Sequence, residues 1–256
     1  RGLETTGGML SKVITEKGSI NTSTALCAAG AWSSYFCRSL GIKVPQLKVK
    51  GTVARTNPIE TKINGSIFDK KVSIRKRLDG GYTVAHGSIL DHPITPSTLY
   101  FAPKYIQALI KEFNGLRLSI GKEFIDELTA PKTWDLDKES PFEKNRVLNP
   151  KPNKNVIAKI SSEISNVYPE LKDAKIIESW AGMVETTPDV VPVISPMQKI
   201  PGFYLATGFS GHGFGIGPGA GKVISEMIQN KPTIDLLPFR LERFFDGSPI
   251  KVEATI

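Results

Sequence analysis

Seven glycines fall within residues 208–221, and this run constrains the fold more than any other feature of the sequence. A short apolar segment, 203–206, precedes the run, and a helix-like segment, 221–228, follows it. A strand, a glycine-rich turn and a helix place backbone N–H groups where a ligand can approach. The run has neither the Walker lysine pattern nor a G-x-G-x-x-G that opens a βαβ unit. A tight turn before an amphipathic helix is the plain alternative, but a histidine and an aromatic residue among the glycines favour a cofactor site.

Length and composition allow a substantial core. The chain has 256 residues with 40% hydrophobic content, enough for one large or two small domains. Its net charge is +8, but 33 basic residues are scattered among 25 acidic ones, and no arginine-rich run carries interleaved aromatic residues. The sequence therefore predicts no nucleic-acid partner, whereas a basic field suits an anionic substrate or an anionic membrane.

The sequence also bears on the compartment. No apolar run is long enough to span a bilayer, and we find no signal peptide. Cys27 and Cys37 have neither metal-ligand nor C-x-x-C spacing, so no metal site is predicted. They are typical of buried small hydrophobes in a reducing compartment more than of a disulfide. We expect a cytoplasmic protein without a transmembrane segment, and peripheral attachment to a membrane stays open.

A second strand–turn–helix pattern lies near the start of the chain. Residues 25–28 are apolar and predict a buried parallel strand, and 29–31 form a corner of small residues. An amphipathic helix is predicted from Trp32 or Ser33 to Gly41. This pattern is half of a nucleotide-binding unit, and a packing corner that needs small residues is the alternative.

The other elements follow from hydrophobic alternation and turn residues. A hairpin is predicted from 9–14 and 19–26, with its turn at 16–18. Residues 130–155 hold four prolines and predict a surface connection, and the tail after Pro238 predicts a short element that docks on the body or on a partner chain. The remaining predictions are strands at 49–55, 71–77, 81–87 and 98–101, a hairpin turn at 79–81, and helices at 103–114 and 155–167.

Three segments together resemble the flavoprotein family of D-amino acid oxidase, glycine oxidase and sarcosine oxidase. They are AAGAWSSYFCRSLGIKVPQLKVKGTVART from Ala28, ESWAGMVETTPDVVPVISP at 178–196, and the glycine-rich stretch, in the family's order. The last two look most like the multi-subunit branch of D-hydroxyproline dehydrogenases, opine oxidases and the flavoprotein subunit of hydrogen cyanide synthase.

The resemblance implies an α/β (α+β) fold: the C-terminal part of an FAD-binding Rossmann-like domain plus an antiparallel-sheet substrate domain. The implied division is FAD-binding parts at 1–45 and 176–230, a substrate or lid domain at 46–175, and a docking tail at 231–256. FAD is expected to bind non-covalently, because Gly182 stands where sarcosine oxidases attach flavin through a cysteine. The implied FAD contacts are Ala28, Ala29, Gly30, Trp32, Gly51, Gly182, Met183, Ser210, Gly211, His212, Gly213, Phe214, Gly215 and Ile216.

The chemistry implied is hydride transfer to flavin from the carbon bearing the nitrogen of a D-amino acid, a glycine-like amine or an opine or imino acid. Several relatives place a substrate-binding arginine directly after the glycine of the segment matching Ala181–Met183, where Met183 and Val184 stand here, and sarcosine oxidases place a lysine at Gly215; both cations are missing here. Arg77, ahead of Arg75 and Arg55, is therefore the expected carboxylate anchor. His86 and His212 are the other candidate catalytic residues, with structural roles as the alternative for each.

The Rossmann fingerprint that binds the ADP half of FAD is missing from the 256 residues. The N-terminal half is therefore expected as a separate or cleaved chain, and electron-transfer subunits as further partners, with an acceptor other than oxygen; direct oxidase action is the runner-up. The alternative function is a non-catalytic structural or electron-transfer subunit of a flavoprotein complex.

Overall fold

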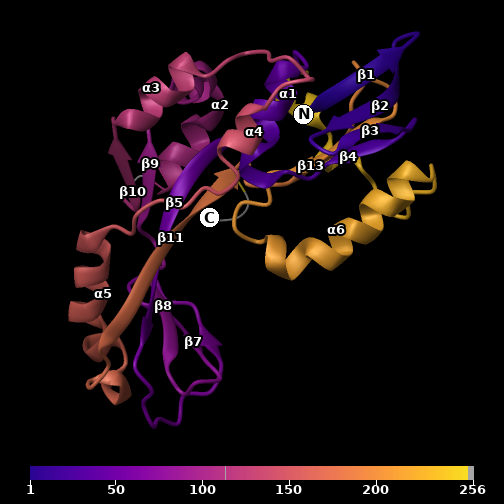
Figure 1. Cartoon of the computed structure of the whole chain (residues 1–256). Coiled ribbons are helices and arrows are strands. Elements are labelled where there is room, and N and C mark those ends of the chain that lie inside the picture. The colour runs from indigo at the N-terminus through magenta and orange to yellow at the C-terminus, as the bar shows by residue number, and fades with distance from the viewer. Residues whose placement is uncertain (113, 253–256) are drawn as a thin grey trace.

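The computed structural model describes residues 1–112 and 114–252 and contains three β-sheets with helices packed around them (Figure 1). Two of the sheets lie on one side of the molecule, and the largest forms the other side. The mixed α/β class predicted from the sequence is confirmed. The predicted division of the chain at residues 45, 175 and 230 stays a prediction.

The N-terminal sheet is an antiparallel meander of β1 (Gly2–Thr6), β2 (Met9–Thr15) and β3 (Gly18–Asn21). The predicted hairpin is present, but its second strand does not continue to residue 26. The Thr22 hydroxyl bonds the Thr24 carbonyl and accepts from the Thr24 N–H, so a local turn interrupts the strand.

The second sheet has the order β12 (Val193–Pro196), β13 (Phe203–Thr207) and β4 (Ala25–Cys27). β4 pairs in parallel with β13, as the apolar run predicts. Its burial is only partial, because Leu26 is 40% exposed. A single 3₁₀ turn, η1 (Gly30–Trp32), leads from β4 into α1 (Ser33–Ser39), which ends before Gly41 at a positive φ of 69°.

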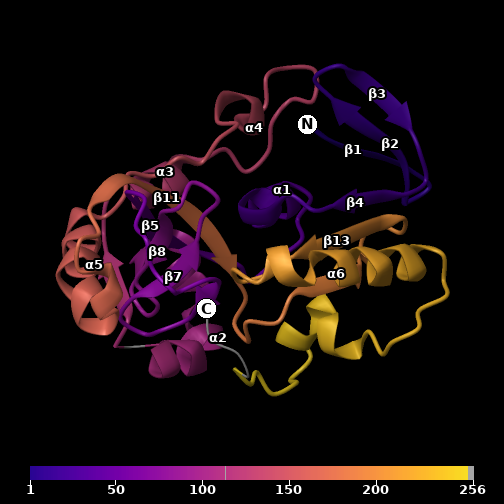
Figure 2. The same ribbon diagram turned by 90° about the horizontal axis from the view of Figure 1, so that it is seen from below.

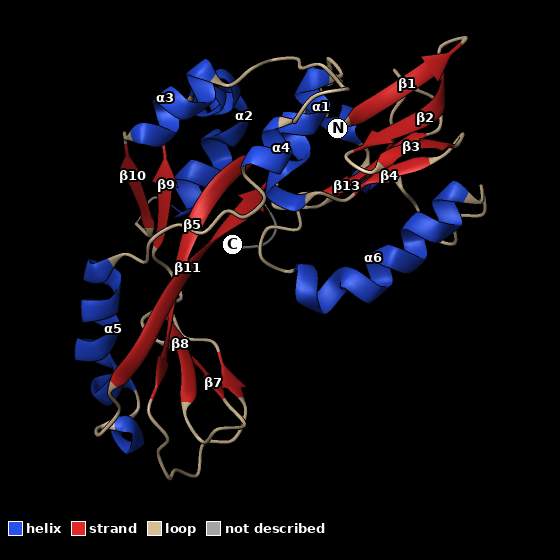
Figure 3. Ribbon diagram, viewed as in Figure 1, coloured by secondary structure: helices blue, strands red, loops and turns tan. Residues whose placement is uncertain are grey.

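The largest sheet has the order β10-β9-β5-β8-β7-β6, and β11 pairs with the other edge of β5 (Figure 3). The β7–β8 hairpin turns at the predicted Asp79–Gly81. The strands are β5 (Leu47–Thr56), β6 (Ser66–Ile67), β7 (Ser73–Lys76), β8 (Tyr82–Ala85), β9 (Leu90–Pro93), β10 (Leu116–Ser119) and β11 (Ile176–Thr186).

One face of this sheet is covered by α5 (Lys154–Val167), whose Val156, Ile160 and Ile164 pack on Ala54 and Val84. The helix matches the predicted one and is followed by η2 (Pro169–Leu171). Figure 2 shows α5 on the side of the sheet away from α6 (Gly213–Ile228). The opposite face of the sheet is therefore not covered by α5.

The predicted strand at 98–101 is wrong, because these residues belong to α2 (Pro96–Glu112). At the helix start, the Thr95 N–H donates to the Thr98 hydroxyl oxygen and the Thr98 N–H donates to the Thr95 hydroxyl oxygen. Pro96 suits the first turn of the helix. Pro103 therefore lies inside the helix and not at its beginning. Two shorter helices follow, α3 (Lys122–Thr129) and α4 (Pro141–Lys144), the second within the predicted surface connection.

Helix α6 begins at Gly213, eight residues before the predicted start at Gly221. Five glycines and Pro218 lie within it, each glycine costing roughly 1 kcal/mol relative to alanine. Its second half packs through Ile224 and Met227 against β12 and β13. The glycines are thus compatible with a helix that is anchored at its C-terminal end.

The C-terminal tail forms η3 (Leu237–Phe239) and η4 (Leu241–Phe244) and docks on the body of this chain. Leu241 and Phe244 are buried in the cluster that also contains Phe203 and Leu205 of β13. Docking on the body, one of the two predicted outcomes for the tail, is therefore observed.

Candidate functional site

Two of the predicted cofactor segments leave the same edge of the second sheet. β4 and β13 are parallel, so the turns after them, 28–30 and 208–212, begin side by side. Gly30 has a φ of 52°, and the hydroxyl of Thr207 donates to its carbonyl at 3.3 Å. Ala28 and Ala29 are exposed at this edge, and Trp32 is half-buried. The structure brings these predicted residues together.

Gln46 joins the two turns, and no sequence pattern pointed to it. Its Nε2 donates to the Gly30 carbonyl at 3.1 Å and to Thr207 Oγ1 at 2.7 Å. Its Oε1 accepts from the backbone N–H of Ser34 in α1. One buried amide therefore fixes the turn after β4, the end of β13 and the start of α1.

Ser210 and Tyr105 connect these turns to the long β5–β11 pair. Ser210 is fully buried with a φ of 51°, and its hydroxyl donates to the Gly208 carbonyl at 3.0 Å and to Thr186 Oγ1 at 3.4 Å. The Tyr105 hydroxyl accepts from the Leu47 N–H at 3.1 Å and lies 2.7 Å from the Thr186 carbonyl. Burial raises the pKa of Tyr105, so its hydroxyl stays protonated and able to donate.

The face of β5 that is buried changes at Gly51. Before it, the odd-numbered Leu47 and Val49 are buried; after it, the even-numbered Thr52, Ala54 and Thr56 are buried, and these lie on the opposite face of the strand. Beyond Gly51, the face opposite α5 is therefore open. Gly51 pairs directly with Gly182 of β11, and a Cβ at either position would meet nothing within 4 Å.

The open face continues as rows across neighbouring strands. The next row is Trp180, Val53 and Ala85, about 7 Å from the glycines, since two strand residues span that distance. Trp180 is 38% exposed and was not among the predicted site residues. The third row carries charge: Glu178, Arg55, Thr83 and Arg75. A flat opening thus adjoins an apolar row and then an ionic one.

The start of α6 lies beside this opening. A Cβ on Gly211 would be 3.8 Å from Val184, which shares the face of Gly182, and Figures 1 and 2 both place the start of α6 next to the end of β11. His212 is the N-cap residue and is exposed, as are Gly215 and Ile216. Phe214 is 99% exposed, and Gly213 is half-buried. The predicted loop residues therefore lie on one side of the opening and leave it unfilled.

The three arginines on this sheet have different partners. Arg77 Nε contacts both carboxylate oxygens of Asp79, at 3.1 and 3.2 Å. Arg55 lies 2.6 Å from Glu178 and 3.5 Å from Asp79, and its Nε is buried without a well-aligned hydrogen bond. Arg75 is exposed, and the described part of the chain gives it no hydrogen bond or ion pair.

His86 and Met183 lie away from the opening. Val84, two residues before His86, packs with α5, so alternation places His86 on the covered side of the sheet, and burial and the charge of Lys159 in α5 lower its pKa. Met183 pairs with Lys50, on the face opposite to Gly182, and Lys50 is bound by Asp91 at 3.5 Å. The structure does not bring His86 together with His212 or with Arg77.

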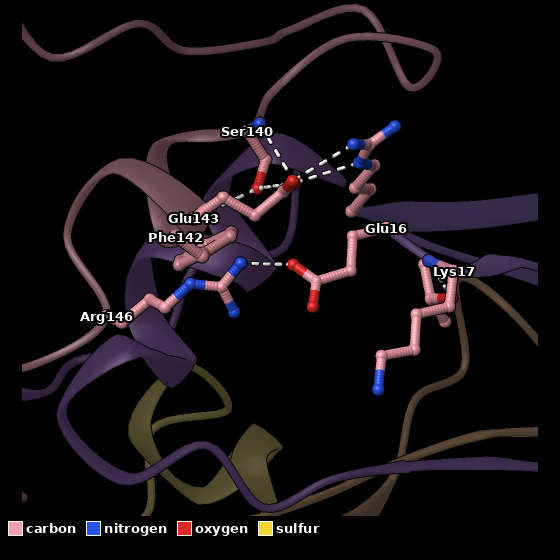
Figure 4. A pocket seen from close by; sticks show the side chains of 8 residues that line it. Glu16, Lys17, Ser140, Phe142, Glu143 and Arg146 are labelled. Atoms are coloured by element: carbon pink, nitrogen blue, oxygen red, sulfur yellow. Dashed lines mark hydrogen bonds and ion pairs between the residues drawn. The ribbon is translucent and has the colours of Figure 1, made fainter.

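A separate hollow of about 410 Å³ lies between the N-terminal sheet and α4 (Figure 4). Four of its charged groups form pairs: Arg1 makes a two-pronged contact with Glu143, and Arg146 pairs with Glu16. None of the predicted site residues lines it. Among the described residues, no group of three or more histidine, cysteine or acidic side chains could hold a metal ion. The β5–β11 opening is therefore the candidate site.

Comparison with known proteins identifies the class. The DAO family model, described as FAD dependent oxidoreductase, matches residues 1–227. An L-amino acid deaminase from Proteus myxofaciens, solved in complex with anthranilate, is 32% identical with a TM-score of 0.89, over 95% of this chain and 55% of that chain. Glycine oxidase from Pseudomonas aeruginosa is 22% identical over 93% of this chain and 51% of its own length. D-amino acid dehydrogenase from Bradyrhizobium diazoefficiens is 23% identical over 94% and 45%.

The chain belongs to the FAD-dependent oxidoreductase family. The predicted resemblance, the oxidoreductase class and FAD as the family's cofactor are confirmed. The chain spans about half the length of these relatives. Its residues fit a flat ring: Gly51 and Gly182 leave the space that a Cβ would fill, beside the exposed glycine loop at 211–215.

A Gly51→Val substitution tests cofactor binding separately from folding stability. A Cβ at this position meets nothing within 4 Å and valine suits a strand, so the free energy of unfolding should change by no more than about 0.5 kcal/mol. The flavin content of the purified protein should fall, because the branched side chain occupies the opening. Absorbance near 450 nm per protein measures it. Full flavin content in a stable variant would place the ring elsewhere.

Proposed function

We propose that this chain forms the substrate-facing and ring-facing half of an FAD-dependent amino acid dehydrogenase or oxidase. The observation that carries the proposal is the opening at Gly51 and Gly182, flanked by the glycine loop on one side and by an apolar and an ionic row on the other. Bound FAD would accept a hydride from the carbon that bears the substrate nitrogen. The chain's own residues hold the substrate over the opening, exclude water and neutralise its carboxylate.

Arg55 is the carboxylate anchor in this proposal, ahead of the Arg77 predicted from the sequence. Arg55 is on the same strand as Gly51, and one row separates them. Arg77 lies beyond the next strand, and its Nε contacts both carboxylate oxygens of Asp79, which Arg55 approaches only to 3.5 Å. A substrate carboxylate can replace Glu178 at Arg55, because Glu178 is a more exposed partner, with 56% of its side chain accessible.

The substrate is proposed to be an amino acid with its α-carboxylate free. The likeness to an L-amino acid deaminase, at 32% identity over 95% of this chain, favours the L configuration over the predicted D-amino acid. Trp180 and Val53, in the row between the glycines and Arg55, would pack against the substrate side chain. FAD is proposed to be non-covalent, since Gly182 offers no thiol for attachment.

The ADP half of FAD is proposed to bind to a polypeptide segment outside these 256 residues. Support comes from the second sheet, where β4 is an outer strand in the order β12-β13-β4 and its Leu26 is 40% exposed. A further parallel strand can add to that edge. Electrons are proposed to pass to an acceptor other than oxygen, because Gly215 stands where the resembled sarcosine oxidases carry a lysine, and that cation is missing here.

Anaerobic flavin bleaching tests the function. The flavin-loaded holoprotein, mixed with L-amino acids, their D enantiomers, glycine and sarcosine, should lose its absorbance near 450 nm with L-amino acids. The product should be the corresponding 2-oxo acid after imine hydrolysis. A holoprotein that no amine or amino acid bleaches, while dithionite does, would contradict the proposed activity.

Replacing Arg55 by leucine should weaken transition-state binding of amino acids by about 2–5 kcal/mol, the range for truncating one partner of a buried charge pair. An amine without a carboxylate should be affected much less. The ratio of kcat/KM for the two substrates measures the effect, with Arg77→Leu as the matched variant. A larger loss for Arg77→Leu than for Arg55→Leu would restore the order predicted from the sequence.

We further propose that the protein is cytoplasmic and peripheral at a membrane, with α2 as the contact. The helix buries Phe101 and Ala108 but turns Leu99, Ile106 and Ile110 outward, exposed by 62%, 54% and 73%. Lys43 lies beside this helix and donates to the Tyr100 hydroxyl, whereas Lys104 and Lys111 of the helix donate to carbonyls of the C-terminal tail. An exposed apolar helix face with a neighbouring lysine suits an anionic lipid surface. Within residues 1–112 and 114–252, we find no helix both long and apolar enough to cross a bilayer.

A double substitution, Ile106→Glu with Ile110→Glu, should weaken binding to vesicles containing phosphatidylglycerol by about tenfold or more, since it places charge on the inserted face. Co-sedimentation measures the binding. Phe68→Glu is the control, because Phe68 is 73% exposed on a distant loop of the largest sheet. Equal binding by all three proteins would exclude α2 as the contact.

A further inference from the structure

A buried ion pair joins the C-terminal tail to the segment that follows β11. Arg243 of η4 contacts both carboxylate oxygens of Asp189, at 2.7 and 3.0 Å, and donates to the Val191 carbonyl at 2.8 Å. The two side chains are only 8% and 10% exposed. A two-pronged pair of this kind fixes the orientation as well as the distance of its partners.

The pair holds a strained turn. Val190, between the two residues that Arg243 contacts, is buried and has a φ of 65°. That region is unfavourable for a β-branched residue, which adopts it only when its surroundings impose it. The Asp189 carboxylate also accepts from the Val191 N–H at 3.1 Å, and Arg243 holds that carboxylate in place. The tail therefore supplies much of the constraint on this turn.

The turn at 187–191 also contacts the glycine-rich loop directly. A Cβ on Gly208 would lie 2.3 Å from the Thr187 methyl group, so the loop backbone packs directly on Thr187. Thr187 in turn donates its hydroxyl to the Val191 carbonyl, the same group that Arg243 contacts. Thr186 meets the Ser210 hydroxyl at 3.4 Å. A continuous set of contacts thus runs from the tail through 186–191 to residues 208–210.

We propose that Arg243 and Asp189 are positioning residues for the cofactor loop, so that the C-terminal tail sets the flavin affinity of a site it does not touch. This inference rests on the proposed function only in taking FAD as the ligand of the loop. Without the pair, Val190 relaxes from its left-handed conformation, Thr187 moves, and residues 208–211 lose their support. The start of α6 is then no longer held beside Gly182.

The test combines a weakened pair with relief of the strain. Arg243→Lys keeps the charge but loses the two-pronged geometry, and it should raise the dissociation constant for FAD by about tenfold or more. Val190→Gly alone should leave the constant unchanged, because glycine adopts a positive φ readily. Combining the two should recover most of the lost affinity. Arg240→Gln is the matched control, since Arg240 pairs with Asp246 at the surface of the same tail.

Hydrogen exchange on the flavin-free protein gives a readout independent of the cofactor. Amides at 208–213 should exchange faster in Arg243→Lys and return towards the wild-type rate in the double variant. Faster exchange with no change in FAD affinity would mean that the loop at 208–213 does not bind the cofactor, which contradicts the proposed function as well. Unchanged exchange, or failure of Val190→Gly to restore it, would overturn the positioning role itself.

Discussion

The antiparallel pairing of β5 with β11 is the constraint on which the rest of the structure depends. The ladder runs from Ile176 opposite Thr56 to Thr186 opposite Leu47. One end carries α5 and the β7–β8 hairpin, and the other meets Tyr105, Ser210 and the turns of the second sheet. The register shifts once, between Ile176 and Glu178, and is constant from Glu178 opposite Arg55 onward, so it sets the position of the ionic row relative to the glycine loop.

The candidate site is open mainly because glycines without side chains line it. Gly51 and Gly182 open the sheet, and the glycines of α6 keep the facing helix thin along its first half. Polar groups beneath the opening are fully engaged: Gln46, Thr207 and Tyr105 bond backbone carbonyls or N–H groups. A surface that is open above and rigidly hydrogen-bonded below suits a planar ligand whose position must not vary.

The sequence was informative wherever local chemistry decides the structure. The parallel strand at 25–27, the helix at 154–167 and the Asp79–Gly81 turn follow from apolar runs, periodicity and turn residues. It failed where tertiary contacts decide. Helix α6 begins at Gly213 although glycine has a low helix propensity, because the packing of Ile224 and Met227 stabilises the helix at its other end. Gln46 has no motif, since its role comes from three elements that meet only in the folded chain.

The same limit applies to the predicted catalytic residues. The sequence ranks Arg77 ahead of Arg55, and only the fold shows that Arg77 Nε contacts both carboxylate oxygens of Asp79 and that Arg55 shares a strand with Gly51. His86 directly follows β8, and the sequence does not say which face of the sheet its side chain lies on. Only the packing of Val84 against α5 shows that this face is the covered one.

The change of buried side at Gly51 makes the two strands intolerant of insertion. Side chains alternate along a strand, so one extra residue in either strand would exchange its two faces beyond that point. In β11 such a slip would turn Met183 towards the opening in place of Gly182, and in β5 it would turn Lys50 or Thr52 there in place of Gly51. The spacing between Gly51 and Arg55 is therefore as much a part of the site as the residues themselves.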